Sequence, residues 1–78
     1  MKVNDVIRIT GGDRYSLIKS TVYENEKYFL AVKLKENNDF DLNSLLIFKE
    51  CSDIDGTYVK IVYDERIIKI LNKIFSEN

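Results

Sequence analysis

The fold of this chain is decided by residues 3–35, which read VNDVIRITGGDRYSLIKSTVYENEKYFLAVKLK. Two polar breaks, Gly11-Gly12-Asp13 and Glu24-Asn25-Glu26, divide this stretch into three apolar runs. Glycine adopts positive φ without strain and asparagine tolerates it better than most residues, so each break can reverse the chain tightly. The pattern therefore predicts three antiparallel strands, at residues 3–10, 15–23 and 27–35.

Two further strands follow a polar loop. Residues 36–39 read ENND and cannot bury an apolar face, whereas residues 42–51 contain the run Leu45-Leu46-Ile47-Phe48. A turn at residues 52–56 precedes residues 57–63, where apolar and polar side chains alternate as in a half-buried strand. The expected fourth and fifth strands are therefore residues 42–51 and 57–63.

The last segment changes from strand to helix periodicity. Its apolar residues recur at the three-and-four spacing of one helix face, with Ile68 at the margin of a stripe formed by Ile67, Ile70, Leu71, Ile74 and Phe75. Asp64 can cap the first turn, and Glu65 and Lys73 suit the two ends of the helix dipole. We therefore expect a helix at about residues 65–76. The predicted class is α+β, a single domain over residues 1–78 in which this helix packs on one face of a five-stranded antiparallel β-meander.

The third and fourth predicted strands are apolar on both faces. In residues 27–35, Tyr28, Leu30 and Val32 point to one side while Phe29 and Ala31 point to the other. Because the helix covers only one face, the second face needs another cover. Either the sheet curls toward a half-barrel and closes on itself, or the second face meets another chain.

The amino-acid composition lacks several residue types that enzymes commonly use for catalysis. The 78 residues include no histidine, tryptophan or proline and a single cysteine, Cys51, so His-dependent acid-base and nucleophile pairs are absent. With 12 basic and 13 acidic residues the chain has no strong field to gather a polyanion. We expect a protein that is not an enzyme and that uses no cofactor and no metal.

The expected location is the cytoplasm. One cysteine cannot form an internal disulfide, which favours a reducing compartment. Asn4 and Asp5 stand where an export signal would need an apolar stretch, and no apolar run approaches the roughly 20 residues of a membrane span.

Charged residues offer two chemical alternatives. Lys27, Lys33 and Lys35 share one predicted strand face with Phe29, an arrangement that would suit a weak single-stranded nucleic-acid binder. A carboxylate-based hydrolase would have to be built from Asp39, Asp41, Asp53 and Asp55, which ordinary loop and turn chemistry also explains. Neither pattern has the spacing of a specific motif.

The leading hypothesis is a protein-binding module that acts by contact or occlusion. Contact would run through the sheet face opposite the helix or through an exposed strand edge to which the partner adds a strand. The candidate anchors on the sheet face are Tyr28, Phe29, Phe48 and Tyr58. The partner would be another protein or a second copy in a homodimer. Size and composition also fit an inhibitor encoded by a phage or another mobile element.

The order of these features resembles a bacterial family of small cytoplasmic proteins known only as a domain of unknown function. The resemblance runs from about Gly12 to Phe75 and rests on Tyr15-Ser16-Leu17-Ile18, Tyr28-Phe29-Leu30, Leu45-Leu46-Ile47-Phe48, Asp55-Gly56 and Val62-Tyr63-Asp64. It implies a β-meander with a C-terminal helix and supplies no activity, ligand or catalytic residue.

Overall fold

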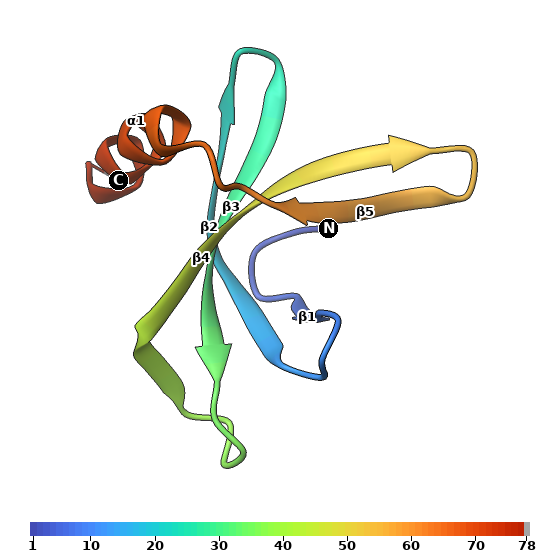
Figure 1. The fold of residues 1–78 in the computed structure, drawn as a ribbon, viewed down its shortest axis with the longest axis vertical. Coiled ribbons are helices and arrows are strands. Elements are labelled where there is room, and N and C mark those ends of the chain that lie inside the picture. The colour runs from blue at the N-terminus through green and yellow to red at the C-terminus, as the bar shows by residue number, and fades with distance from the viewer. Residues whose placement is uncertain (78) are drawn as a thin grey trace.

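The chain forms one curled sheet followed by one helix (Figure 1). The computed structural model describes residues 1–77. Its elements are β1 (Val6–Arg8), β2 (Arg14–Tyr23), β3 (Glu26–Leu34), β4 (Phe40–Asp53), β5 (Gly56–Ile61) and α1 (Glu65–Ser76). The strands lie in the order β1-β2-β3-β4-β5 and every neighbouring pair is antiparallel. The predicted α+β meander with a C-terminal helix is confirmed.

Turn chemistry sets the chain reversals as the sequence predicts. Glu24 and Asn25 have φ values of 50° and 65°, and Tyr23 pairs directly with Glu26. Two consecutive residues with positive φ make the turn whose twist matches that of the flanking strands. The β2–β3 hairpin is therefore tight and its register is fixed.

The strand bounds differ from the prediction at both ends of β4. The strand begins at Phe40 and ends at Asp53, two residues beyond the predicted segment at each end. Its pairing with β3 jumps from Val32–Leu45 to Lys33–Asp41, so residues 42–44 form a bulge. Asp41 stabilises this bulge because its carboxylate accepts bonds from the Asn43 amide and the Ser44 hydroxyl. Phe40 and Asp41, which lie outside the predicted strand, therefore belong to a bulged strand.

β1 is shorter than predicted, at three residues. Asn4 has a φ of 80°, which interrupts extended structure ahead of the strand. The preceding residues still contact β2, because the Asn4 amide donates to the Leu17 carbonyl and the Leu17 amide donates to the Asp5 carbonyl. The N-terminal segment thus continues along the edge of β2 without being a regular strand.

The two sides of the sheet carry separate apolar cores. The concave side buries the side chains of Tyr15, Leu17, Phe29, Ala31 and Phe48. The rings of Tyr15 and Phe48 meet edge to face, with centroids 5.8 Å apart at an interplanar angle of 85°. A register shift between Leu17 and Lys19 leaves Ile18 unpaired and bends β2. The sheet therefore curls into a half-barrel. Of the two ways predicted to cover the second face, curling and contact with another chain, the structure shows curling.

The helix covers the opposite side of the sheet. Leu71 and Phe75 are buried there against Tyr28 and Ile47, and Asp64 caps the helix by accepting bonds from the amides of Arg66 and Ile67. Ile70 is the exception to the predicted stripe, since its side chain is 37% exposed while Ile68 packs on the core. The apolar stripe is therefore rotated slightly from the predicted one.

A lysine from the sheet holds the last turn of the helix. The Lys19 ammonium donates a 2.7 Å bond to the Phe75 carbonyl in a partly buried setting. This carbonyl belongs to the last turn, where the acceptors have no partner within the helix and the helix dipole attracts a cation. Lys19 therefore joins β2 to the end of α1 at a long sequence separation.

Replacing Lys19 with methionine is expected to lower the free energy of unfolding by about 1–2 kcal/mol, because it removes a charge-assisted bond and keeps the apolar stem. Urea unfolding followed by circular dichroism measures the loss. Lys69→Met is the control, since Lys69 is an exposed lysine of α1, the helix that Lys19 contacts. Equal effects of the two substitutions would show that the bond to Phe75 contributes nothing.

No helix within residues 1–77 has the length and apolar character needed to cross a membrane.

Candidate functional site

An open groove lies between the two edge strands of the half-barrel. β1 and β5 stand at opposite ends of the strand order and are not paired with each other. The groove between them has a volume of about 790 Å³. Its floor is apolar and comes from three strands and their flanks: Ile7, Ile9, Phe48, Val59 and Ile61. The sheet thus covers the concave core on one side, and the core is open to solvent at the gap between β1 and β5.

Strand alternation explains why the floor is apolar. Val59 and Ile61 are two residues apart on β5, so both point toward the concave side, where they pack against the buried core. Ile7 and Ile9 do the same from β1 and the residue after it. By the same alternation the intervening Arg8 and Lys60 point away from the concave side, and they contribute to the groove lining from its rim.

The electrostatics of the groove favour a negatively charged occupant. The residues that line it include Arg8 and Lys60 and no carboxylate. Arg8 donates one guanidinium bond, of 2.8 Å, to the Gly12 carbonyl, which is a neutral acceptor. The Lys60 ammonium lies 6.0 Å from the centroid of the Tyr58 ring. Neither contact is an ion pair, although Arg8 also lines a neighbouring pocket that contains the carboxylates of Asp13, Glu36 and Asp41.

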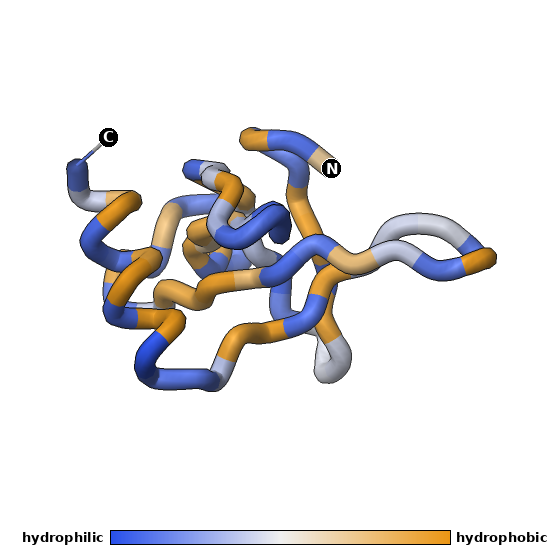
Figure 2. The backbone as a smooth tube through the Cα atoms, turned by 90° about the horizontal axis from the view of Figure 1, so that it is seen from above, coloured by the Kyte–Doolittle hydropathy of each residue, from blue (hydrophilic) through white to orange (hydrophobic). Residues whose placement is uncertain are grey.

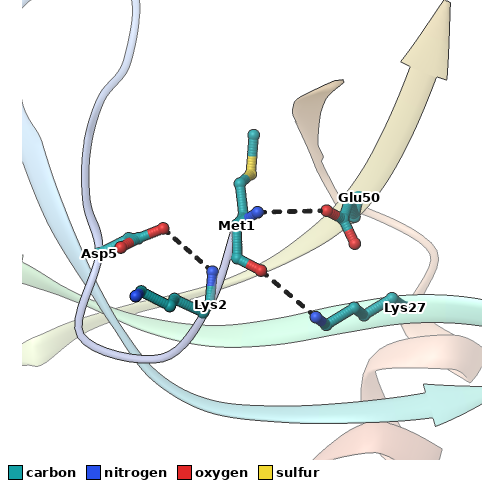
Figure 3. Close-up of polar contacts among 5 residues, drawn as sticks. All are labelled: Met1, Lys2, Asp5, Lys27 and Glu50. Carbon is teal, nitrogen blue, oxygen red and sulfur yellow. Dashed lines mark hydrogen bonds and ion pairs between the residues drawn. The ribbon is translucent and has the colours of Figure 1, made fainter. Parts of the chain in front are cut away.

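The segment before β1 is attached beside the groove by polar contacts (Figure 3). The Met1 ammonium lies 3.6 Å from a Glu50 carboxylate oxygen, and the Lys27 ammonium donates a 3.3 Å bond to the Met1 carbonyl. The Lys2 amide donates to the Asp5 carboxylate over 3.0 Å. These contacts join Met1 to both β3 and β4, and Met1 contributes to the groove lining.

The tyrosines divide between the cores and the groove. Three of them pack with the two cores: Tyr15, Tyr23 and Tyr28. Burial, and after it the adjacent Glu24, raises the pKa of Tyr23 above its ordinary value. The other two, Tyr58 and Tyr63, line the groove and are 38% and 78% exposed. These two rings are the ones available for recognition.

The predicted anchors are separated by the fold. Tyr28 is buried beneath the helix, so it lies on the face opposite to the one predicted for contact. Phe29 and Phe48 point to the concave side, and both are fully buried in its core. These three side chains cannot act as surface anchors without opening a core. Tyr58 alone of the four is exposed, and it lies at the groove.

The three lysines of the nucleic-acid alternative do not surround an exposed ring. Lys27 lies 5.1 Å from the Phe29 ring centroid, but that ring is fully buried. The Lys27 ammonium contacts Met1, and the Lys33 ammonium lies 3.7 Å from an Asp13 carboxylate oxygen. Lys35 is exposed at the end of β3. The arrangement therefore lacks the stacking platform that this alternative requires.

The four aspartates of the hydrolase alternative stay in their local turns. Asp39 accepts a bond from the Asn37 side-chain amide, and Asp53 accepts one from the Asp55 backbone amide. Asp41 holds the β4 bulge. Among residues 1–77 no group of three or more acidic or cysteine side chains converges on a point that could hold a metal ion.

The groove residues were missed by reasoning from the sequence. The alternation of residues 57–63 correctly separates inward from outward side chains, and it marks Val59 and Ile61 as inward. It does not reveal that β1 and β5 stay apart. Ile54 was also not identified as a candidate functional residue. Isoleucine is uncommon between two turn aspartates, and this could have indicated it from the sequence.

Comparison with protein-family models, with curated proteins and with solved structures finds no match to this chain. The resemblance to a bacterial family therefore stays a prediction from the sequence, and the function has to be argued from the groove.

Proposed function

We propose that this chain is a non-enzymatic protein-binding module that acts by contact or occlusion through the groove between β1 and β5. The observation that carries the proposal is an apolar floor left open between two unpaired strand edges. Exposed strand edges accept an added strand by main-chain hydrogen bonds, and the side chains of that strand then enter neighbouring pockets. An extended segment laid along β5 would find both features together.

The lining residues support a protein ligand. Tyr58 and Tyr63 offer rigid rings of the type enriched at the centres of protein interfaces, and they are already at the surface. Arg8 and Lys60 would orient an acidic segment along the groove. Lys27, Lys33 and Lys35 support the nucleic-acid alternative less well, because the ring beside them is buried. Cys51, a free thiol, supports the cytoplasmic setting that the proposal assumes.

The proposal predicts that peptides selected for binding to the intact protein use the groove. A library of random 12-residue peptides is the probe, and fluorescence polarisation measures the affinity of those selected. The double variant Tyr58→Ala/Tyr63→Ala should weaken their binding by about tenfold or more, because it removes two interface-type rings without touching a core.

The control is Val22→Ala/Phe40→Ala, which truncates two exposed apolar residues that do not line the groove. It should leave the affinities unchanged within about twofold. A library that yields no binder, or binders that lose equal affinity to both double variants, would contradict the proposal.

A further inference from the structure

The β4–β5 hairpin carries an exposed isoleucine at its tip. Every residue from Ser52 to Tyr58 is exposed, and Ile54 is 99% exposed. Figure 2 shows this hairpin extending away from the rest of the chain on the side opposite the helix, with an apolar tip. Turns normally use Gly, Asn, Asp or Ser, each for a conformational reason that isoleucine does not share. The tip therefore presents an apolar side chain to solvent.

The tip and the groove are complementary in charge and polarity. Asp53 and Asp55 flank Ile54, so the tip is an apolar side chain between two carboxylates. The groove offers the reverse, an apolar floor with Arg8 and Lys60 at its margin and no acidic lining residue. A ligand with the chemistry of the tip would bury its apolar side chain and place its carboxylates beside the two cations.

The tip cannot fill the groove of its own chain. Ile54 lies four residues before Tyr58, the first β5 residue of the groove lining. Four residues of extended chain span roughly 13 Å, and Ile54 is at the end of a hairpin that extends away from the rest of the chain (Figure 2). Only another molecule can bring such a tip to this site.

Resting on the proposed function of the groove, we propose that its occupant is the hairpin tip of a second copy, and that the contact is reciprocal. The β4–β5 hairpin and the strands β1 and β5, whose residues line the groove, lie on the side of the molecule away from the helix (Figure 1). β5 has a free edge that runs from the groove to the tip. Two copies related by a twofold axis would align these edges antiparallel and insert each tip into the other groove.

A reciprocal contact closes after two copies. In an isologous interface the same surface is used twice, whereas a head-to-tail contact that does not close leads to filaments. Here the groove, the free edge of β5 and the tip form one continuous surface, so a second copy satisfies all three together. The expected product is therefore a dimer of limited size.

Sedimentation equilibrium of the full chain tests the proposal. The wild-type chain should dimerise, and Ile54→Ser should raise the dissociation constant by about a hundredfold, because two tips leave their grooves. The control is Val22→Ser, which changes an apolar residue that is 67% exposed near another hairpin and should alter the constant by less than about twofold.

Charge reversal tests the pairing itself. The Asp55→Lys variant and the Lys60→Glu variant should each be monomeric, because in a homodimer of either one the side chains at positions 55 and 60 of the two copies would carry the same charge. An equimolar mixture of the two variants should associate again, because both tip-to-groove contacts then join opposite charges. Circular dichroism of each variant checks that it stays folded.

A wild-type chain that is monomeric at about 1 mM would overturn the proposal, as would an Ile54→Ser variant that dimerises like the wild type or a mixture that fails to associate. The peptide selection separates the two levels of inference. A monomer whose groove still binds selected peptides would overturn the second-copy occupant and leave the groove function intact, whereas loss of both removes both.

Discussion

Replacing Phe48 with alanine is expected to lower the free energy of unfolding by about 3–5 kcal/mol. The ring is fully buried in the concave core, packs edge to face on Tyr15 and also contributes to the groove floor. Truncation would leave a cavity at the centre of the half-barrel that rigid strands cannot fill. A domain of this size has a total stability of about 4–12 kcal/mol, so the loss is a large share of it.

Urea unfolding of Phe48→Ala measures this loss, with Phe40→Ala as the control. Phe40 is on the same strand, but its side chain is 49% exposed, and its truncation should cost less than about 1 kcal/mol. A Phe48→Ala chain that unfolds at the same urea concentration as Phe40→Ala would show that the concave side has no core of its own.

Replacing Leu71 with alanine is expected to cost about 3–5 kcal/mol on the other side of the sheet. Leu71 is fully buried between the helix and the residues Tyr28 and Ile47. Alanine has high helix propensity, so the substitution removes packing without weakening the helix itself. The expected result is a much lower melting temperature with the same helical signal below the transition.

Ile70→Ala is the matched control for this prediction, because Ile70 is adjacent in the chain and 37% exposed. Its loss should be about 1 kcal/mol or less. Thermal unfolding followed by circular dichroism compares the two. If both variants melt together, the helix is oriented as the sequence stripe predicts and Leu71 is not its centre of contact.

The elements that local chemistry controls were predictable. The helix follows from apolar spacing and the Asp64 cap, and the β2–β3 hairpin follows from a turn that positive φ at Asn25 permits. The start of β4 was not predictable in this way. Phe40 and Asp41 follow the polar residues 36–39 and lie outside the predicted strand, and they join β4 because a bulge at residues 42–44 lets Asp41 pair with Lys33.

The candidate site depended on tertiary structure that no local pattern encodes. Alternation places Phe29 and Phe48 on the face away from the helix, but whether that face is open or covered depends on how far the sheet curls. The bend at Ile18 covers those rings, while the separation of β1 and β5 leaves the neighbouring residues accessible. The candidate interaction surface is therefore the groove between β1 and β5 and not the centre of the sheet, where the sequence predicts it.

The single layer of sheet between the two cores has a consequence for cooperativity. Tyr28 and Phe29 are consecutive residues of β3, yet the first belongs to the core beneath the helix and the second to the core of the half-barrel. A backbone shift that relaxes one core necessarily displaces the other. Neither half of this molecule is therefore an autonomous folding unit, and its hydrophobic interior is gained or lost as a whole.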